Sequence, residues 1–216
     1  GQRHLDIKNG LSVPPKLTSL SNLLSMAIKP NWCFEMLYTG RRSFGNVVGH
    51  VDGVSNLSSL SAWVSEAFDQ SFTWDDIEQI KEWWGGKLIL KGILDENDAS
   101  MAVKSGADAV IVSNHGGRQL DGTCSTISML PKIKKLLAGD IEIFVDGGIR
   151  SGQDVLKSCA FGADGTFVGR PFLYGLGALG EQGVIKSLEI IQKELDLSMA
   201  LCGVRSTNEI GYHIIL

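Results

Sequence analysis

Residues 109–122 read Ala-Val-Ile-Val-Ser-Asn-His-Gly-Gly-Arg-Gln-Leu-Asp-Gly, and this run decides the fold class. Its first part, 109–112, is a continuous apolar run of the kind expected for a strand buried on both faces of a parallel sheet. The part that follows presents a hydroxyl, an imidazole and a guanidinium around two glycines. His115 can take up a proton near neutral pH, and Arg118 can hold a carboxylate through two parallel hydrogen bonds. The run therefore predicts a functional site at the end of a buried strand.

On both sides of this run, from about residue 76 onward, the chain alternates between short apolar runs and helix-like stretches. The expected strands are 88–90, 109–112, 141–145 and 165–168. The expected helices are 75–84, 96–104, 126–137, 152–160 and 183–201. Alternation of this kind predicts an α/β fold with a parallel sheet.

Local signals support this assignment. Asp95 is expected to cap the helix 96–104, and Ser151 to cap the helix 152–160, because their side-chain oxygens can accept from the free amides of the first turn. The segments 104–108 and 159–164 both end in Gly-Ala-Asp before a strand. They suggest one repeated β/α unit.

Composition bounds the class of protein. The 216 residues suit one domain with a substantial core, and the net charge of −4 gives no basic field that would attract nucleic acid. The four cysteines stand far apart without the spacing of a zinc site, so we expect reduced thiols in a cytoplasmic protein and no bound metal. No apolar run is long enough to span a membrane, and the first residues resemble neither a signal peptide nor a transit peptide.

The first 70 residues hold no clear parallel strand, and four β/α units can be counted after them. A closed (β/α)8 barrel needs eight units, typically about 250 residues. Because the chain also lacks an initiator Met, we expect it to start within a longer protein. The pattern alone is compatible with a doubly wound sheet and with half of a barrel.

Three further constellations follow expected strands, where α/β folds place ligands. Lys91 closes the first strand, and because an unpaired buried ammonium is costly, it should face solvent or a ligand. Residues 146–152 read Asp-Gly-Gly-Ile-Arg-Ser-Gly, which brings backbone amides, an arginine and a helix start together and suits a phosphate. Gly169-Arg170-Pro171 is a second turn of this kind. The structural alternatives are an exposed strand-end lysine, a satisfied core histidine at 115 and two ordinary glycine-rich loops.

In combination, the run 113–122 with Lys91, residues 146–150 and Gly169-Arg170 resembles the FMN-dependent 2-hydroxy-acid dehydrogenase and oxidase family. The resemblance covers nearly the whole chain. It implies a TIM (β/α)8 barrel, of which this chain supplies roughly strands five to eight and the C-terminal helices. Residues 1–216 are then the C-terminal part of one barrel domain, with a long loop over 1–70 and β/α units over 71–216.

The resemblance implies a role for each of these residues. His115 is the base that takes a proton from the substrate, and Arg3 and Arg118 bind the substrate carboxylate. Lys91 and Ser113 contact the flavin of FMN. The residues implied at the ribityl phosphate end are Asp146, Gly147, Gly148, Arg150, Gly169 and Arg170. Physical chemistry agrees, since oxidation of a 2-hydroxy acid needs a positioned base, a carboxylate clamp and a cation beside the reduced cofactor.

The family pattern is incomplete in this chain. The family's substrate-binding tyrosines, several flavin contacts and the aspartate that partners the catalytic histidine belong to a part upstream of Arg3. Half a barrel would also expose sheet edges and apolar surface. We therefore expect these 216 residues alone to be poorly folded or inactive, and the full-length protein to be a homo-oligomer.

The segment 1–70 suggests which branch of the family applies. Residues 29–32 and 46–48 resemble the L-lactate and mandelate dehydrogenases, in which the segment associates with the membrane. Apolar residues between 17 and 37 could lie on a bilayer interface, which predicts a cytoplasmic protein held peripherally on the inner face of the membrane. The alternative is an ordinary loop helix that packs on the barrel or on a neighbouring subunit. Residues 72–77 and the pair Trp83-Trp84 are interpreted as a helix entry and core residues.

These observations predict FMN-dependent oxidation of an L-2-hydroxy acid, with L-lactate to pyruvate favoured and electrons passed to a quinone or a cytochrome. The alternatives are an oxygen-using 2-hydroxy-acid oxidase of the glycolate or lactate oxidase type, a phosphate-binding barrel isomerase, and an inactive fragment.

Overall fold

The computed structural model describes residues 8, 20–39, 45–55, 57–137 and 139–215, and the chain divides after Phe72 into two compact units. The unit before this point contains α2 (Leu20–Ala27), α3 (Pro30–Tyr38) and α4 (Leu57–Glu66). α2 and α3 contact each other, and no residue of α3 is buried. No helix in the described ranges is long and apolar enough to cross a membrane.

The unit Thr73–Leu216 contains a four-stranded parallel sheet in the order β1-β2-β3-β4. Its strands are β1 (Ile89–Ile93), β2 (Ala109–Val112), β3 (Glu142–Val145) and β4 (Gly165–Thr166). Each crossover brings the chain to the next neighbour without reversing the order. A doubly wound sheet reverses at a switch point, whereas a barrel adds its strands in sequence. The order therefore favours the barrel-type α/β fold over the doubly wound sheet; the strand numbers within the barrel stay a prediction.

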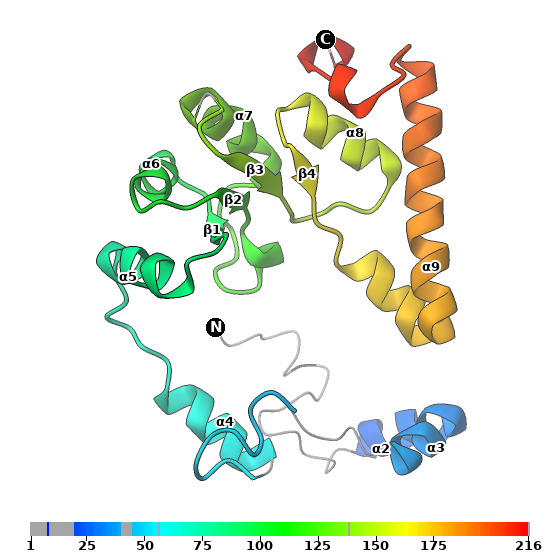
Figure 1. Cartoon of the computed structure of the whole chain (residues 1–216). Helices are drawn as coiled ribbons and strands as arrows, with labels where there is room; N and C mark the ends of the chain where they lie inside the picture. Colours follow the sequence, from blue (N-terminus) through cyan, green and yellow to red (C-terminus); the bar gives the residue numbers. More distant parts are fainter. Residues whose placement is uncertain (1–7, 9–19, 40–44, 56, 138, 216) are drawn as a thin grey trace. The chain divides into compact units, whose positions relative to one another are not determined.

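Helices form an arc around the outer side of these strands (Figure 1). They are α5 (Trp74–Trp84), α6 (Glu96–Lys104), α7 (Thr126–Leu137) and α8 (Gly152–Ala160), and α9 (Arg170–Leu201) follows β4. The core lies between the sheet and this layer, where Val110, Val112, Ile143 and Val145 meet α6 and α7. Burial of a branched apolar side chain contributes roughly 1.5–3 kcal/mol, so this layer is the main source of stability in the unit.

The predicted bounds of β2, α6, α7 and α8 are confirmed. So are both predicted caps: the Asp95 side chain accepts from the amides of Asn97 and Asp98, and the Ser151 side chain accepts from the amide of Asp154. These elements were predictable because their signals are local. A cap residue and the periodic apolar positions of one turn lie within a few residues of each other.

α5 and β3 each differ from the prediction by one residue at their first position, and three elements differ by more. β1 runs on through Lys91 to Ile93 across a bulge at Gly92, where φ is +100°. β4 is shorter than expected, because it is an edge strand with no partner beyond it among the described residues. α9 begins at Arg170 rather than at residue 183, with a break at Leu179 and Gly180.

The repeated unit is confirmed at the amino-terminal ends of the strands. Asp108 donates its amide to the Leu88 carbonyl at 2.8 Å and accepts from the Leu88 amide at 2.8 Å. Asp164 makes the same pair of hydrogen bonds with Ile143, both at 2.8 Å. Each aspartate also pairs with a lysine of a preceding helix, Asp108 with Lys81 of α5 and Asp164 with Lys134 of α7. The two aspartates therefore tie neighbouring strands and helices together at this end of the sheet.

The interpretation of Trp83 and Trp84 as core residues is wrong in the described structure. Their exposed fractions are 76% and 67%, and the Trp84 ring nitrogen donates to the Lys87 carbonyl at 3.0 Å. Trp74, at the start of α5, packs against the core instead, after a capping box formed by Thr73 and Asp76. The reason is that β1 is an edge of the described sheet, so no described element covers this side of α5.

Candidate active site

Three polar side chains from neighbouring strands meet at the carboxyl-terminal end of the sheet. Lys91 of β1 donates to the Ser113 hydroxyl, which directly follows β2, with 2.8 Å between Nζ and Oγ. The same ammonium forms an ion pair with the carboxylate of Asp146, which directly follows β3. Parallel strands in register place their carboxyl ends side by side, so residues far apart in sequence are brought into one cluster. The structure thus brings together Lys91, Ser113 and Asp146, and Lys91 is not simply an exposed strand-end lysine.

Only one oxygen of the Asp146 carboxylate takes part in this cluster. Its Oδ2 faces Lys91, whereas its Oδ1 is buried without a hydrogen-bond partner among the described residues. A buried carboxylate oxygen without a donor is costly, and such groups often mark the position of a bound ligand. The free oxygen is suited to accept from a hydroxyl of a polar molecule at this edge of the sheet.

The loop after β2 presents His115 in a strained conformation. The Ser113 hydroxyl accepts from the His115 amide at 3.1 Å, and the Asn114 side chain accepts from the Gly116 amide at 3.0 Å. His115 has a φ of +54°, the left-handed region that non-glycine residues adopt at a cost of about 1–3 kcal/mol. Its side chain is exposed, which excludes the alternative of a core histidine.

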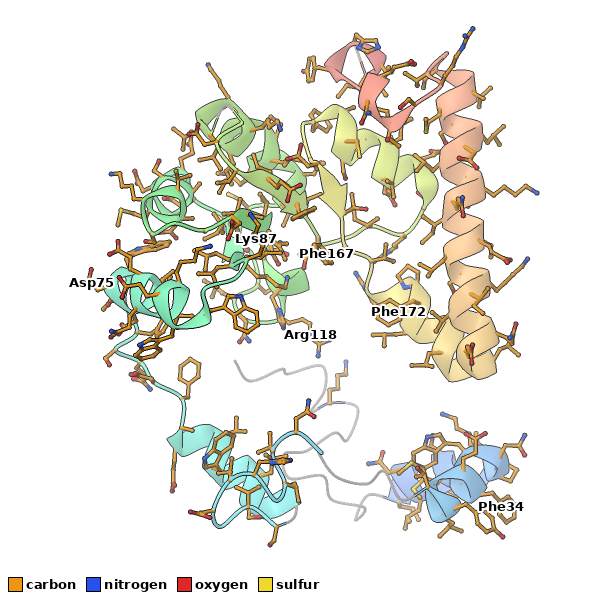
Figure 2. The ribbon with its side chains drawn as sticks, viewed as in Figure 1. Phe34, Asp75, Lys87, Arg118, Phe167 and Phe172 are labelled. Atoms are coloured by element: carbon orange, nitrogen blue, oxygen red, sulfur yellow. The ribbon has the colours of Figure 1, made fainter. Side chains whose placement is uncertain are left out.

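Arg118 lies in the same loop, one short 3₁₀ turn (His115–Gly117) after the histidine. Its amide donates to the His115 carbonyl at 3.4 Å, and its side chain projects away from α6 and α7 (Figure 2). Both candidate substrate-handling side chains of this loop are therefore on its exposed side. Arg3, the other predicted carboxylate ligand, lies outside the described residues.

The loop after β3 is shaped by two glycines. Gly147 and Gly148 have φ values of +93° and +116°, and the Thr126 hydroxyl donates to the Asp146 carbonyl at 2.7 Å. A Cβ on Gly147 would lie 3.1 Å from the Thr126 hydroxyl and 3.3 Å from the Asn114 side-chain oxygen. The amides of Gly147 and Gly148 donate to no protein group in the described part of the chain. Two successive open amides of this kind form a concavity suited to an anion.

The start of α8 differs from the prediction. Asp154 Oδ2 accepts from the amides of Arg150 at 2.9 Å and Ser151 at 3.0 Å. Glu194 of α9 accepts from the Gly152 amide at 2.9 Å. These three amides were expected to be open to a phosphate, but they are already used by carboxylates of the protein. The candidate anion site is therefore narrowed to the Gly147 and Gly148 amides. The other predicted contributors, Arg150, Gly169 directly before α9 and Arg170 at its start, are all exposed.

Sequence reasoning missed the residues that support this site. Thr126 and Asn114 hold the loops after β2 and β3 against each other, and Asp154 fixes the end of the second loop. Asp154 could have been found, because Ser151 and Asp154 have the spacing of a capping box. The contact from Glu194 could not, because it crosses 42 residues without a local pattern.

Comparisons with known proteins place this geometry in context. A family model described as FMN-dependent dehydrogenase matches residues 1–216. An L-lactate dehydrogenase of Bartonella quintana is 42% identical over 213 residues, which cover 98% of this chain and 55% of that protein. An L-lactate dehydrogenase of Allorhizobium ampelinum is 43% identical over 212 residues, with 98% and 55% covered. The chain thus spans about half the length of these curated relatives.

Solved structures agree. The monotopic membrane protein (S)-mandelate dehydrogenase superposes with a TM-score of 0.92 at 32% identity, covering 99% of this chain and 56% of that one. A mandelate oxidase superposes with a TM-score of 0.66 at 42% identity, covering 72% of this chain and 45% of that one. Another mandelate oxidase structure, which contains an FMN adduct, has a TM-score of 0.62 at 45% identity, with 63% and 44% covered.

Proposed function

The chain belongs to the FMN-dependent dehydrogenase family, and from this premise we propose that it is part of an enzyme that oxidises an L-2-hydroxy acid. L-Lactate, oxidised to pyruvate, is the proposed substrate, and a quinone or a cytochrome is the proposed electron acceptor. The observation that carries the proposal is the cluster of Lys91, Ser113 and Asp146 beside the exposed, strained His115. A cation, hydroxyl, carboxylate and imidazole at the carboxyl ends of parallel strands are the groups that this chemistry needs.

The described residues fit FMN. The unpartnered Oδ1 of Asp146 can accept from a ribityl hydroxyl, and the open amides of Gly147 and Gly148 can donate to a phosphate. Arg150, Gly169 and Arg170 are proposed to complete the phosphate end, and Lys91 and Ser113 to face the ring. Bound FMN would supply the two-electron acceptor for the substrate. The Lys91 ammonium, fixed by Ser113, would hold positive charge where negative charge develops.

His115 and Arg118 are proposed to handle the substrate. Arg118 can bind the carboxylate through a bidentate pair of hydrogen bonds, with Arg3 as the second proposed ligand. The imidazole of His115 can take a proton from the substrate once the carboxylate is held. The left-handed backbone of His115, supported by the Ser113 hydroxyl, directs the ring outward from the loop rather than into the core.

We place the chain in the second half of the barrel, supplying roughly strands five to eight. The support is the sequential order of four parallel strands and the cover of about half of each relative. The isolated 216-residue chain is then proposed to be inactive, because each edge strand has one side without a strand partner in the described structure and large apolar side chains such as Trp83 and Trp84 are exposed. Tight FMN binding and turnover by this chain alone would contradict the proposal. A homo-oligomeric full-length protein stays a prediction.

A dehydrogenase is favoured over an oxygen-using oxidase. The mandelate dehydrogenase structure matches 99% of the chain, whereas the mandelate oxidase structures with TM-scores of 0.62 and 0.66 match 63% and 72%. Sequence identity points the other way, at 32% against 45% and 42%, so the oxidase is kept as the second candidate. Family membership speaks against the isomerase, which would share only the phosphate loops with this site.

A peripheral contact with the inner face of the cell membrane is part of the proposal. Along α2, α3 and the turn between them the exposed apolar side chains include Leu24, Ile28, Trp32, Phe34 and Leu37, and Figure 2 shows Phe34 on α3. One similar structure is described as a monotopic membrane protein. An exposed apolar face on a helix pair of this size suits insertion into the interfacial layer of a bilayer.

Membrane contact is tested by sedimentation with vesicles of phosphatidylcholine and phosphatidylglycerol. Replacement of both Trp32 and Phe34 by Ser should abolish cosedimentation of the full-length protein. The matched control is Tyr174→Ser, which removes an aromatic side chain that is 71% exposed on α9 and should change nothing. Equal binding by all three proteins would contradict the contact.

The activity is tested by anaerobic addition of L-lactate to the full-length protein loaded with FMN. L-Lactate should bleach the absorbance of oxidised flavin, D-lactate should not, and (S)-mandelate and glycolate should act more slowly. Stopped-flow mixing with air then separates the two candidates, because slow reoxidation indicates a dehydrogenase and fast reoxidation an oxidase. Failure of every 2-hydroxy acid to bleach the flavin would overturn the proposed function.

A further inference from the structure

The end of the loop Asp146–Ile149 is held from a distance by α9. Glu194 of this helix accepts from the Gly152 amide at 2.9 Å, across 42 residues of sequence. The approach is close, since a Cβ on Gly152 would lie 2.0 Å from the Leu195 nitrogen and 2.4 Å from the Glu194 carbonyl carbon. Only glycine fits at 152, so the backbone of α9 lies directly on the first turn of α8.

Glu194 itself is fixed in place. The Ser198 hydroxyl donates to the Glu194 carbonyl at 2.7 Å, one turn further along α9. The neighbouring Leu195 packs against the buried cluster of Leu156 and Met199, which joins α8 to α9. The Glu194 carboxylate is therefore carried by a well-packed part of α9. It also lies at the amino end of α8, where the helix dipole favours negative charge.

The other end of the loop is anchored as well. The Asp146 amide donates to the Val112 carbonyl at 3.2 Å, and its carbonyl accepts from Thr126 at 2.7 Å. Between the two anchors lie Gly147 and Gly148, whose amides have no protein partner in the described ranges. Glycines with positive φ have broad conformational freedom, so the direction of these amides depends on the fixed ends.

α9 contributes to the candidate phosphate region twice. It begins at Arg170, directly after the turn that is proposed to contact the phosphate, and its second half carries Glu194. The two halves are locked together where a Cβ on Gly175 would lie 2.2 Å from the Gly183 carbonyl oxygen. The helix thus sets the spacing between the two turns.

We propose that Glu194 is a positioning residue that fixes the Gly147 and Gly148 amides for the phosphate of FMN. It does so through the Gly152 amide and without touching the cofactor. This inference rests on the proposed function and deepens it. It implies that loss of the Glu194 carboxylate weakens recognition of the phosphate specifically, rather than recognition of the flavin ring.

The test measures dissociation constants of FMN and of riboflavin, which lacks the phosphate, by fluorescence titration of the full-length apoprotein. Glu194→Ala should weaken FMN binding by about tenfold to a hundredfold, the effect of one lost charge-assisted hydrogen bond, and change riboflavin binding by less than about twofold. Glu194→Gln keeps an acceptor but loses the charge, so it should weaken FMN binding by a smaller factor, about threefold to tenfold, and change riboflavin binding by less than about twofold. Glu189→Ala, on the same helix with its exposed carboxylate paired to Lys186, is the matched control and should bind both flavins as the wild type does.

The possible outcomes distinguish a failure of this inference from a failure of the proposed function. Equal weakening of FMN and riboflavin by Glu194→Ala or by Glu194→Gln would mean that Glu194 only stabilises the fold, and unchanged FMN binding would mean that it does not position the loop. Either result overturns this inference and leaves the proposed function standing. If Glu194→Ala does not fold, the FMN-to-riboflavin ratio of Glu194→Gln decides, and a ratio equal to that of the wild type overturns the inference. A wild-type protein that binds neither flavin overturns both.

Discussion

At the amino-terminal ends of the strands, Asp108 accepts hydrogen bonds from two lysines and a backbone amide. At the carboxyl-terminal ends, Asp146 keeps one buried oxygen without a partner in the described chain. The glycines differ in the same way. Gly162 lies against Lys134 in the repeated unit, whereas Gly147 and Gly148 present open amides. One end of the sheet is closed by its own side chains, and the other leaves polar groups available.

This difference separates stability from function within one sheet. Saturated groups at the amino ends gain nothing from a ligand, and their loss should weaken the fold alone. Groups without partners at the carboxyl ends cost stability unless a ligand satisfies them, and their loss should affect binding and turnover. Substitutions at the amino ends should therefore lower stability without changing FMN binding, whereas substitutions at the carboxyl ends should affect binding and turnover.

The largest effect is expected for His115→Asn at the carboxyl ends. Asparagine tolerates the left-handed φ of +54°, so the change removes the imidazole without added strain. Loss of the proposed general base should lower kcat by about a hundredfold to ten-thousandfold while FMN is retained. Steady-state kinetics with L-lactate measure the loss. His213→Asn, at an exposed histidine of the 3₁₀ turn Tyr212–Ile214, is the control, and a kcat for His115→Asn close to that of the wild type would remove the histidine from the mechanism.

A matched pair of glycines tests the comparison directly. Gly147→Ala and Gly162→Ala both place a Cβ at positive φ, +93° and +104°, so both should lower the free energy of unfolding by on the order of 1–3 kcal/mol. Gly162→Ala should lower it more, because its Cβ would lie 2.5 Å from the Lys134 Cγ. Only Gly147→Ala should also weaken FMN binding, by about tenfold or more, because its amide is one of the two that are proposed to donate to the phosphate. Chemical denaturation and FMN titration of both variants give the two quantities.

Loss of FMN affinity in both variants would contradict this distinction between the two ends of the sheet. If Gly162→Ala lost FMN affinity as strongly as Gly147→Ala, the two ends of the sheet would be coupled through the fold. The closed and open ends would then not be functionally distinct. If neither variant changed FMN affinity, the Gly147 amide would not belong to the binding site.

Much of the fold was predictable from sequence because its signals are short-ranged. Asp95 and Ser151 cap helices within three residues of themselves, and the apolar run of β2 is continuous. The first half of α9 was not predictable. Its glycines look like those of a loop, and the reason for Gly175 is a contact with the Gly183 carbonyl that exists only in the folded chain.

The candidate site was likewise predictable in part only. Lys91, Ser113 and Asp146 were each predicted from their place at the end of a strand, and the parallel register brings them together. The use of Glu194 at the start of α8 was not predictable, because it depends on how two helices pack. The exposure of Trp83 was missed for a related reason, since an apolar residue is buried only where another element covers it.

The smallest expected effect concerns acid stability at the amino ends. Hydrogen bonds from Lys81 and then Lys87 and the Leu88 amide hold the pKa of Asp108 well below its ordinary value of 3.8. Because the folded pKa is lowered, the stabilisation is fully present above the unfolded value and is lost as pH falls through the window below 3.8. Asp108→Asn should therefore have a lower unfolding midpoint than the wild type at neutral pH, and the two midpoints should converge as the pH falls below that value. Lys81→Met should remove more of this acid dependence than Lys87→Met, since Lys81 is the larger cause of the shift. Thermal unfolding followed across this pH range measures the difference, and parallel curves for Asp108→Asn and the wild type would show that the paired aspartate does not stabilise the closed end of the sheet.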